Sequence, residues 1–279
     1  MAGQLYVVAT PIGNLGDITL RALETLRAAD AVAAEDTRVT ARLLAHFGIA
    51  VRTIALHEHN ERRAAAEIVK LVVAGKSVAL VSDAGTPGLS DPGAHAVAAV
   101  REAGLPVVAV PGPSAAACAL SVAGRPLDHV LFYGFLPATP AARRRALEAL
   151  AGQPHALLFY EAPHRIRAAL GDMAAVLGIG RAVTLARELT KLHEEVHTCA
   201  LGEAQAWVDA SAHRERGEYV VIVDPAPAGA GPSPGEAQRV LKLLLAELPA
   251  GRAAALAARI TGAPRDGLYA AALALKGEA

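Results

Sequence analysis

Cysteine is nearly absent from this 279-residue chain, which contains only Cys118 and Cys199. Two cysteines in apolar stretches exclude a disulfide framework and a Cys-x-x-Cys metal site, and they are typical of a reducing compartment. Net charge is also absent, because 27 Lys and Arg residues balance 27 Asp and Glu residues. No overall electrostatic field therefore indicates a nucleic-acid partner, although a local basic patch could still bind one.

Long apolar runs are missing as well. No segment reaches the roughly 18 uninterrupted apolar residues that are needed to cross a bilayer. Residues 1–4 lack the basic start and apolar core of a signal peptide. We therefore expect a cytoplasmic protein without a membrane partner. The fingerprints GxGxxG, GxxxxGK[ST] and GxSxG do not occur either, so the common nucleotide-binding and hydrolase motifs give no lead.

Short β-branched runs alternate with alanine- and leucine-rich segments, which predicts an α/β fold with helices covering parallel strands. The first domain is expected to span 1–120. Its predicted strands are 5–9, 31–35, 52–56, 77–82 and 106–110, and its helices are 18–28, 38–47, 61–74 and 92–103, with a fifth beginning near 111–114.

The second domain is expected to span 121–224 and to contain a mixed sheet with antiparallel members. Its predicted strands are 130–135, 156–160, 182–187, 195–201 and 218–223, and its helices are 140–151, 163–177 and 203–210. A linker rich in proline, glycine and alanine follows at 225–234. The last module, 235–279, is helical and resembles a helix-turn-helix. Because it carries few basic residues, we favour packing or partner binding over nucleic-acid binding for it.

The most informative segment is the loop at 81–93, with the sequence VSDAGTPGLSDPG. It follows a predicted strand and precedes a predicted helix. In open α/β sheets, ligands collect at the carboxyl ends of strands, where glycine lets the backbone approach a ligand closely. An ordinary turn is the alternative, but a simple reversal requires fewer glycines, prolines and aspartates. The loop around Asp83 therefore predicts a small-molecule site.

Four further charged clusters follow predicted strands, at 35–38, 57–61, 160–165 and 187–191. Loops at strand ends often carry function, so these clusters could line one cleft together with the Asp83 loop. Helix capping by Asp36, Thr37 or Asn60 is the structural alternative for the first two clusters. For Lys191, the alternative is a solvated surface lysine.

Residues 193–197 spell His-Glu-Glu-Val-His, a formal HExxH motif. On a helix, its two imidazoles would lie on one face and could bind zinc. The following residues have strand character, however, and strand residues four apart are separated by ~13 Å, too far to share one metal ion. We therefore expect no metal site here.

Six motifs, taken in chain order, resemble the bacterial 16S rRNA cytidine 2′-O-methyltransferases, a branch of the tetrapyrrole methylase superfamily. They lie at 5–18, 35–38, 81–93, 111–115, 160–165 and 187–191. The resemblance covers nearly the whole chain. It implies two α/β domains with S-adenosyl-L-methionine in the cleft between them, a homodimer, and 16S rRNA within the small ribosomal subunit as the substrate. Gly88 and the pair Ala94-His95 depart from the usual pattern.

The resemblance also implies roles for individual residues. The cofactor site would be lined by Pro11, Asp83, Ala84, Gly85, Ser114, Ala115 and Tyr160. A ribose hydroxyl is a poor nucleophile until its proton is removed, so a carboxylate or a lysine is the natural base; the candidates are Lys191, Glu188, Asp36 and Glu161. RNA contacts are expected from Arg38, His57, Arg165 and Arg187. The run Arg143-Arg144-Arg145 predicts a local cationic patch with salt-dependent RNA binding.

Two other classes of function stay open at this point. A tetrapyrrole methyltransferase would require a broad apolar cleft with few cations, whereas the clustered arginines favour phosphate contacts. A non-enzymatic RNA- or protein-binding module would use the same loops only as a scaffold. Stabilisation by S-adenosylmethionine in a thermal-shift assay would exclude the binding module, and RNA-dependent methyl transfer would exclude the tetrapyrrole substrate.

Overall fold

The computed structural model describes residues 3–57, 59–227 and 234–277. The chain forms two compact units. The first comprises Met1–Val122 together with Glu188–Glu195, and the second comprises Ala123–Arg187 and Val196–Ala279. The segment Glu188–Glu195 therefore belongs to the first unit although its neighbours in sequence belong to the second.

The first unit contains a five-stranded parallel sheet in the order β3-β2-β4-β1-β5. Strands β2 and β4 are buried along their whole length, as expected for a parallel sheet covered on both faces. The prediction of a parallel sheet is confirmed. The strands are β1 (Leu5–Val8), β2 (Ala31–Ala34), β3 (Arg52–Ala55), β4 (Val78–Val81) and β5 (Val107–Val110).

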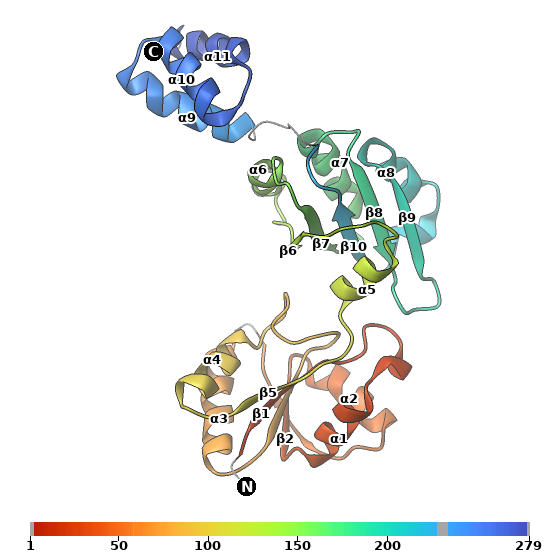
Figure 1. Ribbon diagram of the computed structural model, residues 1–279. Helices are drawn as coiled ribbons and strands as arrows, with labels where there is room; N and C mark the ends of the chain where they lie inside the picture. Colours follow the sequence, from red (N-terminus) through yellow and green to blue (C-terminus); the bar gives the residue numbers. More distant parts are fainter. Residues whose placement is uncertain (1–2, 58, 228–233, 278–279) are drawn as a thin grey trace. The chain divides into compact units, whose positions relative to one another are not determined.

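Helices cover both faces of this sheet (Figure 1). Helices α1 (Leu20–Ala28) and α2 (Thr37–His46) lie on one face, and α3 (Glu61–Val73) and α4 (Ala94–Glu102) lie on the other. Alternate strand residues point to opposite faces of the sheet and so belong to two different hydrophobic cores. Leu80 packs in the core that contains Ile68 of α3, whereas Val81 packs in the core that contains Leu26 of α1. The unit also contains the 3-10 turn η1 (Leu15–Asp17) and helix α5 (Ala115–Val122).

The second unit contains a mixed sheet in the order β6-β7-β10-β8-β9. Strand β10 runs antiparallel to both β7 and β8, whereas β6 and β7 are parallel, so the predicted mixed sheet is confirmed. The strands are β6 (Val130–Phe135), β7 (Ala156–Glu161), β8 (Ala182–Arg187), β9 (Glu195–Ala200) and β10 (Tyr219–Val223).

Helices α6 (Pro140–Leu150), α7 (Ile166–Leu177) and α8 (Leu201–Asp209) pack on one core of this sheet, and the 3-10 turn η2 (Ala212–Glu215) precedes β10. Leu147, Leu170 and Val208 are fully buried and carry the helix side of that core. The helix predicted from residue 163 begins only at Ile166, because residues 162–165 form a turn.

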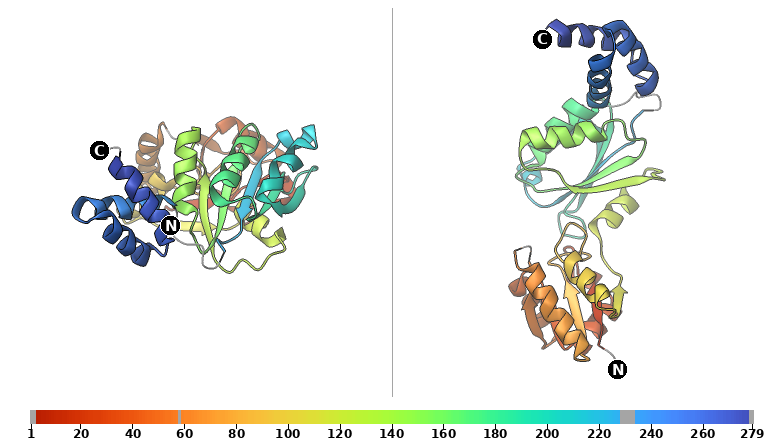
Figure 2. Two further views of the ribbon diagram at one scale, coloured as in Figure 1. Left: turned by 90° about the horizontal axis from the view of Figure 1, so that it is seen from above. Right: turned by 90° about the vertical axis from the view of Figure 1, so that its left-hand side faces the viewer.

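The C-terminal module is a bundle of three helices, α9 (Pro234–Glu247), α10 (Ala250–Thr261) and α11 (Arg265–Gly277) (Figure 2). Small residues let α10 approach its neighbours closely, since Ala253, Ala254 and Ala257 are fully buried. Gly262 ends α10 in a left-handed conformation. Residues 228–233 of the predicted linker lie outside the described residues. Among the described helices, none is long and apolar enough to cross a membrane.

Candidate active site at the carboxyl edge of the first sheet

The strand order places a ligand site between β1 and β4. The chain leaves β1 toward β2 on one side and leaves β4 toward β5 on the other, so these neighbouring strands mark the point where the winding reverses. Crevices at such switch points, beyond the carboxyl ends of the strands, are the usual ligand sites of open α/β sheets. Here the edge is formed by Thr10 and Pro11 after β1 and by Ser82 and Asp83 after β4.

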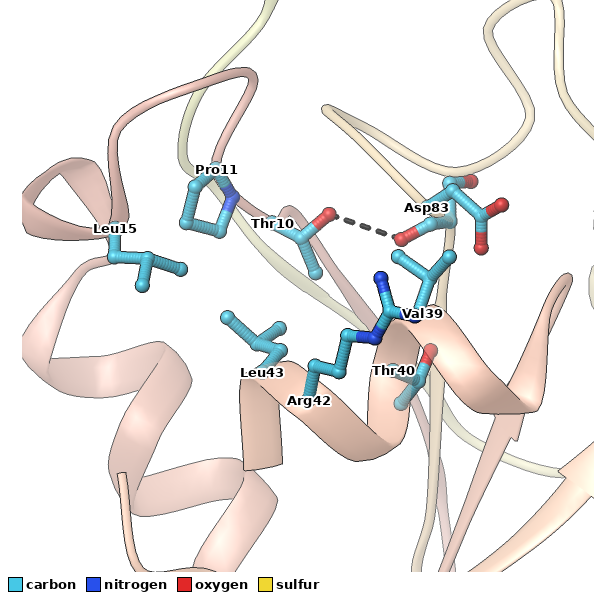
Figure 3. A pocket seen from close by; sticks show the side chains of 9 residues that line it. Thr10, Pro11, Leu15, Val39, Thr40, Arg42, Leu43 and Asp83 are labelled. Carbon is cyan, nitrogen blue, oxygen red and sulfur yellow. Dashed lines mark hydrogen bonds between the residues drawn. The ribbon is translucent and has the colours of Figure 1, made fainter. Parts of the chain in front are cut away.

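Backbone and side-chain hydrogen bonds tie the ends of β1 and β4 together. Thr10 and Gly85 exchange two N–H···O bonds of 2.9 and 3.0 Å, and the Thr10 hydroxyl donates to the Ser82 carbonyl at 3.0 Å (Figure 3). Gly85 has a φ of +82°, and a Cβ there would lie 3.4 Å from the Ile12 side chain. Glycine is therefore needed at this turn because the left-handed backbone disfavours any other residue.

Negative charge collects around Asp83. The Asp83 carboxylate accepts a 3.0 Å hydrogen bond from the Asp36 backbone N–H at the end of β2. Burial raises the pKa of Glu35, and the neighbouring charges of Asp91 and Asp83 raise it further. The edge therefore suits a ligand that carries positive charge.

The loop after Asp83 is anchored at both ends. The Thr86 hydroxyl donates to the Pro113 carbonyl at 3.1 Å, which joins this loop to the turn that starts α5 at Ser114-Ala115. At the other end, the Glu61 carboxylate accepts from the N–H groups of Gly93 and His95 at 2.7 and 3.0 Å. Six of the seven predicted cofactor residues thus belong to loops that share one sheet edge. They are Pro11, Asp83, Ala84, Gly85, Ser114 and Ala115.

A strained loop forms part of the same unit. Glu188 and Thr190 have φ values of +50° and +67°, conformations that non-glycine residues rarely adopt. The Lys191 ammonium donates to the Glu188 carboxylate at 2.7 Å, and the Thr190 N–H donates to Glu194. The Thr190 hydroxyl is buried without a hydrogen-bond partner among the described residues. Such strain costs of order 1–3 kcal/mol per residue and clusters at functional sites.

Gly13 holds the Lys191 side chain against the loop that follows β1. A Cβ atom at Gly13 would lie only 2.4 Å from Cγ of Lys191 and 2.9 Å from its Cε. The aliphatic stem of Lys191 therefore rests directly on the Gly13 backbone. Gly13 was not predicted as a site residue, although it lies in the motif at 5–18, one of the six that resemble the family. The contact joins two predicted motifs that lie far apart in sequence.

A cavity of about 210 Å³ opens beside this edge, between the loop after β1, the end of β4 and helix α2 (Figure 3). Its walls are mostly apolar, and its polar members come from the strand ends and from α2. It is lined by Thr10, Pro11, Leu15, Val39, Thr40, Arg42, Leu43, Ser82 and Asp83. The part of this cavity that α2 supplies was not predicted from the sequence.

Asp36 caps α2 and holds Arg38. Its carboxylate accepts from the Arg38 backbone N–H at 2.8 Å and from the Arg38 guanidinium at 2.6 and 3.0 Å. The capping alternative for Asp36 is therefore realised. The hydrogen bond from the Arg38 side chain holds the pKa of Asp36 well below its usual range, which makes Asp36 a weak proton acceptor. The Arg38 side chain is 85% exposed and can reach a ligand in solvent.

The remaining predicted residue of the first unit is His57, which is exposed after β3. Its backbone N–H donates to the Asn60 side chain at 2.8 Å, and the Asn60 amide donates to the Ala55 carbonyl. Asn60 occupies the N-cap position of α3 but makes no side-chain cap, because its side chain folds back to close this loop. The structure keeps His57 accessible at the sheet edge.

In the second unit, Glu161 is buried beneath Arg165. The two side chains form an ion pair of 3.0 Å, and Arg165 also donates to the Leu136 carbonyl. Burial raises the pKa of Glu161, and the hydrogen bond from the Ala162 N–H opposes this shift. A fully buried and paired carboxylate is better suited to orienting Arg165 than to taking a proton from a substrate.

Two arginine predictions meet a physical objection. Arg187 is 4% exposed and donates to the carbonyl oxygens of Arg216 and His213, so it is held in the interior, which argues against the predicted RNA contact. Arg143 is 3% exposed and pairs with Asp172 at 2.7 Å, so the predicted cationic run does not present all its charges to solvent. Both arginines satisfy buried acceptors, which sequence position does not reveal.

Tyr160, the seventh predicted cofactor residue, lies on β7 in the second unit. Its ring contacts Phe132 and Phe135 edge to face, with centroid distances of 5.1 and 5.7 Å. This aromatic cluster is only partly buried, since the Phe135 side chain is 49% exposed. The cluster offers a partly exposed aromatic surface on β6 and β7.

The formal HExxH motif spans a turn and a strand, as predicted. His193 precedes β9, and His197 lies within it. The His197 ring stacks on Trp207 of α8 at 4.6 Å, with the Arg214 guanidinium on the same indole at 4.0 Å. His197 therefore has a packing role.

Comparison with known proteins gives consistent matches. The sequence profile described as Tetrapyrrole (Corrin/Porphyrin) Methylases matches residues 4–205, and the profile described as RsmI C-terminal HTH domain matches residues 231–276. A protein of Escherichia coli O157:H7 named Ribosomal RNA small subunit methyltransferase I is 52% identical, over 99% of this chain and 96% of its own length. The protein of that name from Pseudomonas aeruginosa is 50% identical, over 99% of both chains.

A solved structure, the methyltransferase CobJ, shares the fold of this chain. It superposes with a TM-score of 0.60 at 21% sequence identity and covers 80% of this chain and 95% of its own. The expected fold class, two α/β parts of tetrapyrrole-methylase type followed by a helical module, is confirmed.

Proposed function

The chain belongs to the ribosomal RNA small subunit methyltransferase I family of tetrapyrrole methylases, and on that premise we propose that it methylates 16S rRNA. The methyl donor is S-adenosyl-L-methionine, and the acceptor is the ribose 2′-hydroxyl of a cytidine. The observation that carries the proposal is the contact between Lys191 and Gly13, because it brings a strained, charged loop to the edge that holds the Asp83 loop.

The residues at the sheet edge fit the cofactor. Gly85 would let the backbone approach the cofactor closely, and the carboxylates of Asp83 and Glu35 suit its positively charged sulfonium. Pro11, Ala84 and the Ser114-Ala115 turn would complete the site, and we propose that Tyr160 contributes an aromatic surface from the second unit. When bound, S-adenosylmethionine supplies an electrophilic methyl group to an oxygen nucleophile.

The chain's own task is to position the ribose hydroxyl and to move its proton. We assign these tasks to the Lys191–Glu188 pair, in which the ammonium holds the hydroxyl oxygen and the carboxylate receives the proton. Both side chains are mostly buried, at 28% and 17% exposure, so water weakens their interaction with a substrate less than at an open surface. Positioning alone can supply roughly 7–11 kcal/mol of such a barrier at best.

RNA is held, in this proposal, by arginines near the edge rather than by a basic surface over the whole protein. Arg38 is exposed beside Asp36, and Arg42 follows one turn later on α2. Arg165 is fixed by Glu161 in the second unit and contributes there. Because the net charge of the chain is zero, its affinity for RNA phosphates comes, in this proposal, from these local contacts.

The assembly and its surroundings complete the proposal. We propose a homodimer that works in the cytoplasm on the small ribosomal subunit, with domains at 1–120, 121–224 and 235–279 joined through 225–234. Light scattering at micromolar concentration should give twice the mass of the chain, and a monomer mass would refute the dimer. Limited proteolysis should cleave first within the 225–234 segment.

Methyl transfer from tritiated S-adenosylmethionine to small ribosomal subunits tests the function. We expect RNA-dependent incorporation at a single cytidine, in the ribose rather than the base. Incorporation into a tetrapyrrole instead of RNA would support the first alternative. A protein that is not stabilised by S-adenosylmethionine in a thermal-shift assay would support the binding module. The 52% identical relative favours RNA, because the solved neighbour at 21% identity shares the fold alone.

A further inference from the structure

The cavity beside α2 has a size that limits its ligand. Its volume of about 210 Å³ lies below the roughly 300–1,000 Å³ of pockets that enclose drug-sized molecules, so it suits a single flat ring system and excludes a tetrapyrrole. Most of its lining is outside the set that we assign to the cofactor. Leu15, Val39 and Leu43 supply apolar walls, as Figure 3 shows.

One of the residues that line the cavity has a hydroxyl without a partner. Ser82 is 2% exposed, and its hydroxyl has no hydrogen-bond partner among the described residues. Thr40 is equally buried and lines the same cavity. An unsatisfied buried hydroxyl is costly, and native proteins rarely keep one without a reason. The Ser82 oxygen is itself enclosed, however, so a ligand in the cavity would meet the exposed Asp83 carboxylate instead.

Arg42 adds a cation to this cavity. Its side chain rises from α2 toward the end of β4 in Figure 3, and it makes no ion pair or hydrogen bond with any residue that the structure describes. Arg38, one turn earlier on the helix, is by contrast held by Asp36. Arg42 is therefore available to a carbonyl or phosphate oxygen of a ligand.

We propose that this cavity receives the base of the target nucleotide, turned out of the RNA stack. The inference rests on the proposed function. A pyrimidine has apolar faces and a polar edge, which match the apolar walls and the charged side chains of Asp83 and Arg42. Cytosine in particular has an amino group, which would donate a hydrogen bond to the Asp83 carboxylate at the cavity edge. The adenine of S-adenosylmethionine is the other nucleobase in the reaction, and the test separates the two.

Val39→Phe narrows the cavity from α2, because Val39 lines it; Val39 is 38% exposed, so the substitution lies outside the buried core. Val73→Phe is the matched control, since Val73 is 68% exposed on α3 and does not line the cavity. We expect Val39→Phe to lower methyl transfer at least tenfold, while calorimetry gives S-adenosylmethionine affinity within twofold of the parent. Loss of cofactor affinity would assign the cavity to adenine and overturn the inference.

A second substitution removes the cation. Arg42→Gln should raise KM for RNA at least tenfold, whereas Arg101→Gln, on the exposed end of α4, should leave it unchanged. Helices run opposite to the strands in this unit, so the end of α4 lies at the other edge of the sheet. Equal effects of the two substitutions would show that Arg42 acts only through general charge and would overturn its role in the cavity.

The decisive experiment combines Val39→Phe with an RNA whose target ribose keeps its 2′-hydroxyl but lacks the base. The abasic RNA should slow the parent enzyme at least tenfold, and Val39→Phe should slow it no further, because the cavity then has no occupant. If the two losses multiply, the base binds elsewhere and the inference is wrong. A parent enzyme that does not methylate intact RNA would instead refute the proposed function.

Discussion

Replacing Lys191 by methionine tests the proposed chemistry most directly. Methionine keeps an unbranched stem that can rest on Gly13, but it removes the ammonium that lies 2.7 Å from Glu188. Loss of a positioned acid–base group typically costs 10²- to 10⁴-fold, so we expect methyl transfer to fall by about 10²-fold or more. Affinity for S-adenosylmethionine should stay within a few-fold, because Lys191 is outside the cofactor set.

The effect on stability should be small in comparison. The Lys191–Glu188 ion pair is partly buried, so removing it should cost about 1 kcal/mol. For a chain of this size that corresponds to a fall in Tm of about 3 °C. The variant therefore stays folded at 25 °C, and a hundredfold loss of rate cannot be attributed to unfolding.

Single-turnover transfer of tritiated methyl groups to small subunits measures the rate, and calorimetry measures cofactor binding. Lys70→Met, at an exposed position of α3, is the control. Transfer at the parent rate by Lys191→Met would refute the role of Lys191 and leave Glu188 to act without it. Gly13→Ala gives an independent check: its Cβ would displace the lysine stem without removing the charge, and we expect roughly tenfold slower transfer.

Three further predictions follow from the charges at the sheet edge. Asp83→Ala should weaken S-adenosylmethionine binding at least tenfold in calorimetry; unchanged affinity would remove Asp83 from the cofactor site. The pKa of Glu35 is raised in the folded protein, so its ionised form weakens the fold above the unfolded value of 4.5. Glu35→Gln should therefore raise Tm at pH 7 but not at pH 4, and an equal change at both would contradict this sign. RNA affinity should fall about tenfold between 50 and 200 mM salt, and a flat response would exclude phosphate contacts.

The sequence was sufficient to predict the strands of the first sheet and that they run parallel, because buried runs such as β2 and β4 are apolar on both faces. It did not predict the order of the strands. It could not predict the contact between Gly13 and Lys191, because that contact joins segments far apart in the chain. The buried contacts of Arg187 were unforeseen for a related reason: its position at a strand end does not reveal that the side chain will donate to the carbonyl groups of Arg216 and His213. Local patterns predict elements, whereas the partners of a polar group are set by packing.

Backbone strain supports the assignment of the two central loops independently of the resemblance. Among the described residues, the non-glycine positions with positive φ are Ser90, Glu188 and Thr190, in the Asp83 loop and the Lys191 loop. The strain is therefore absent from the helices and strands that build the cores. Since each such residue costs of order 1–3 kcal/mol, the fold must stabilise these loops through other contacts. In the Lys191 loop, Glu194 accepts a hydrogen bond from the Thr190 N–H, and Glu188 accepts one from the Lys191 ammonium. These hydrogen bonds fix the ammonium where the proposed reaction requires it.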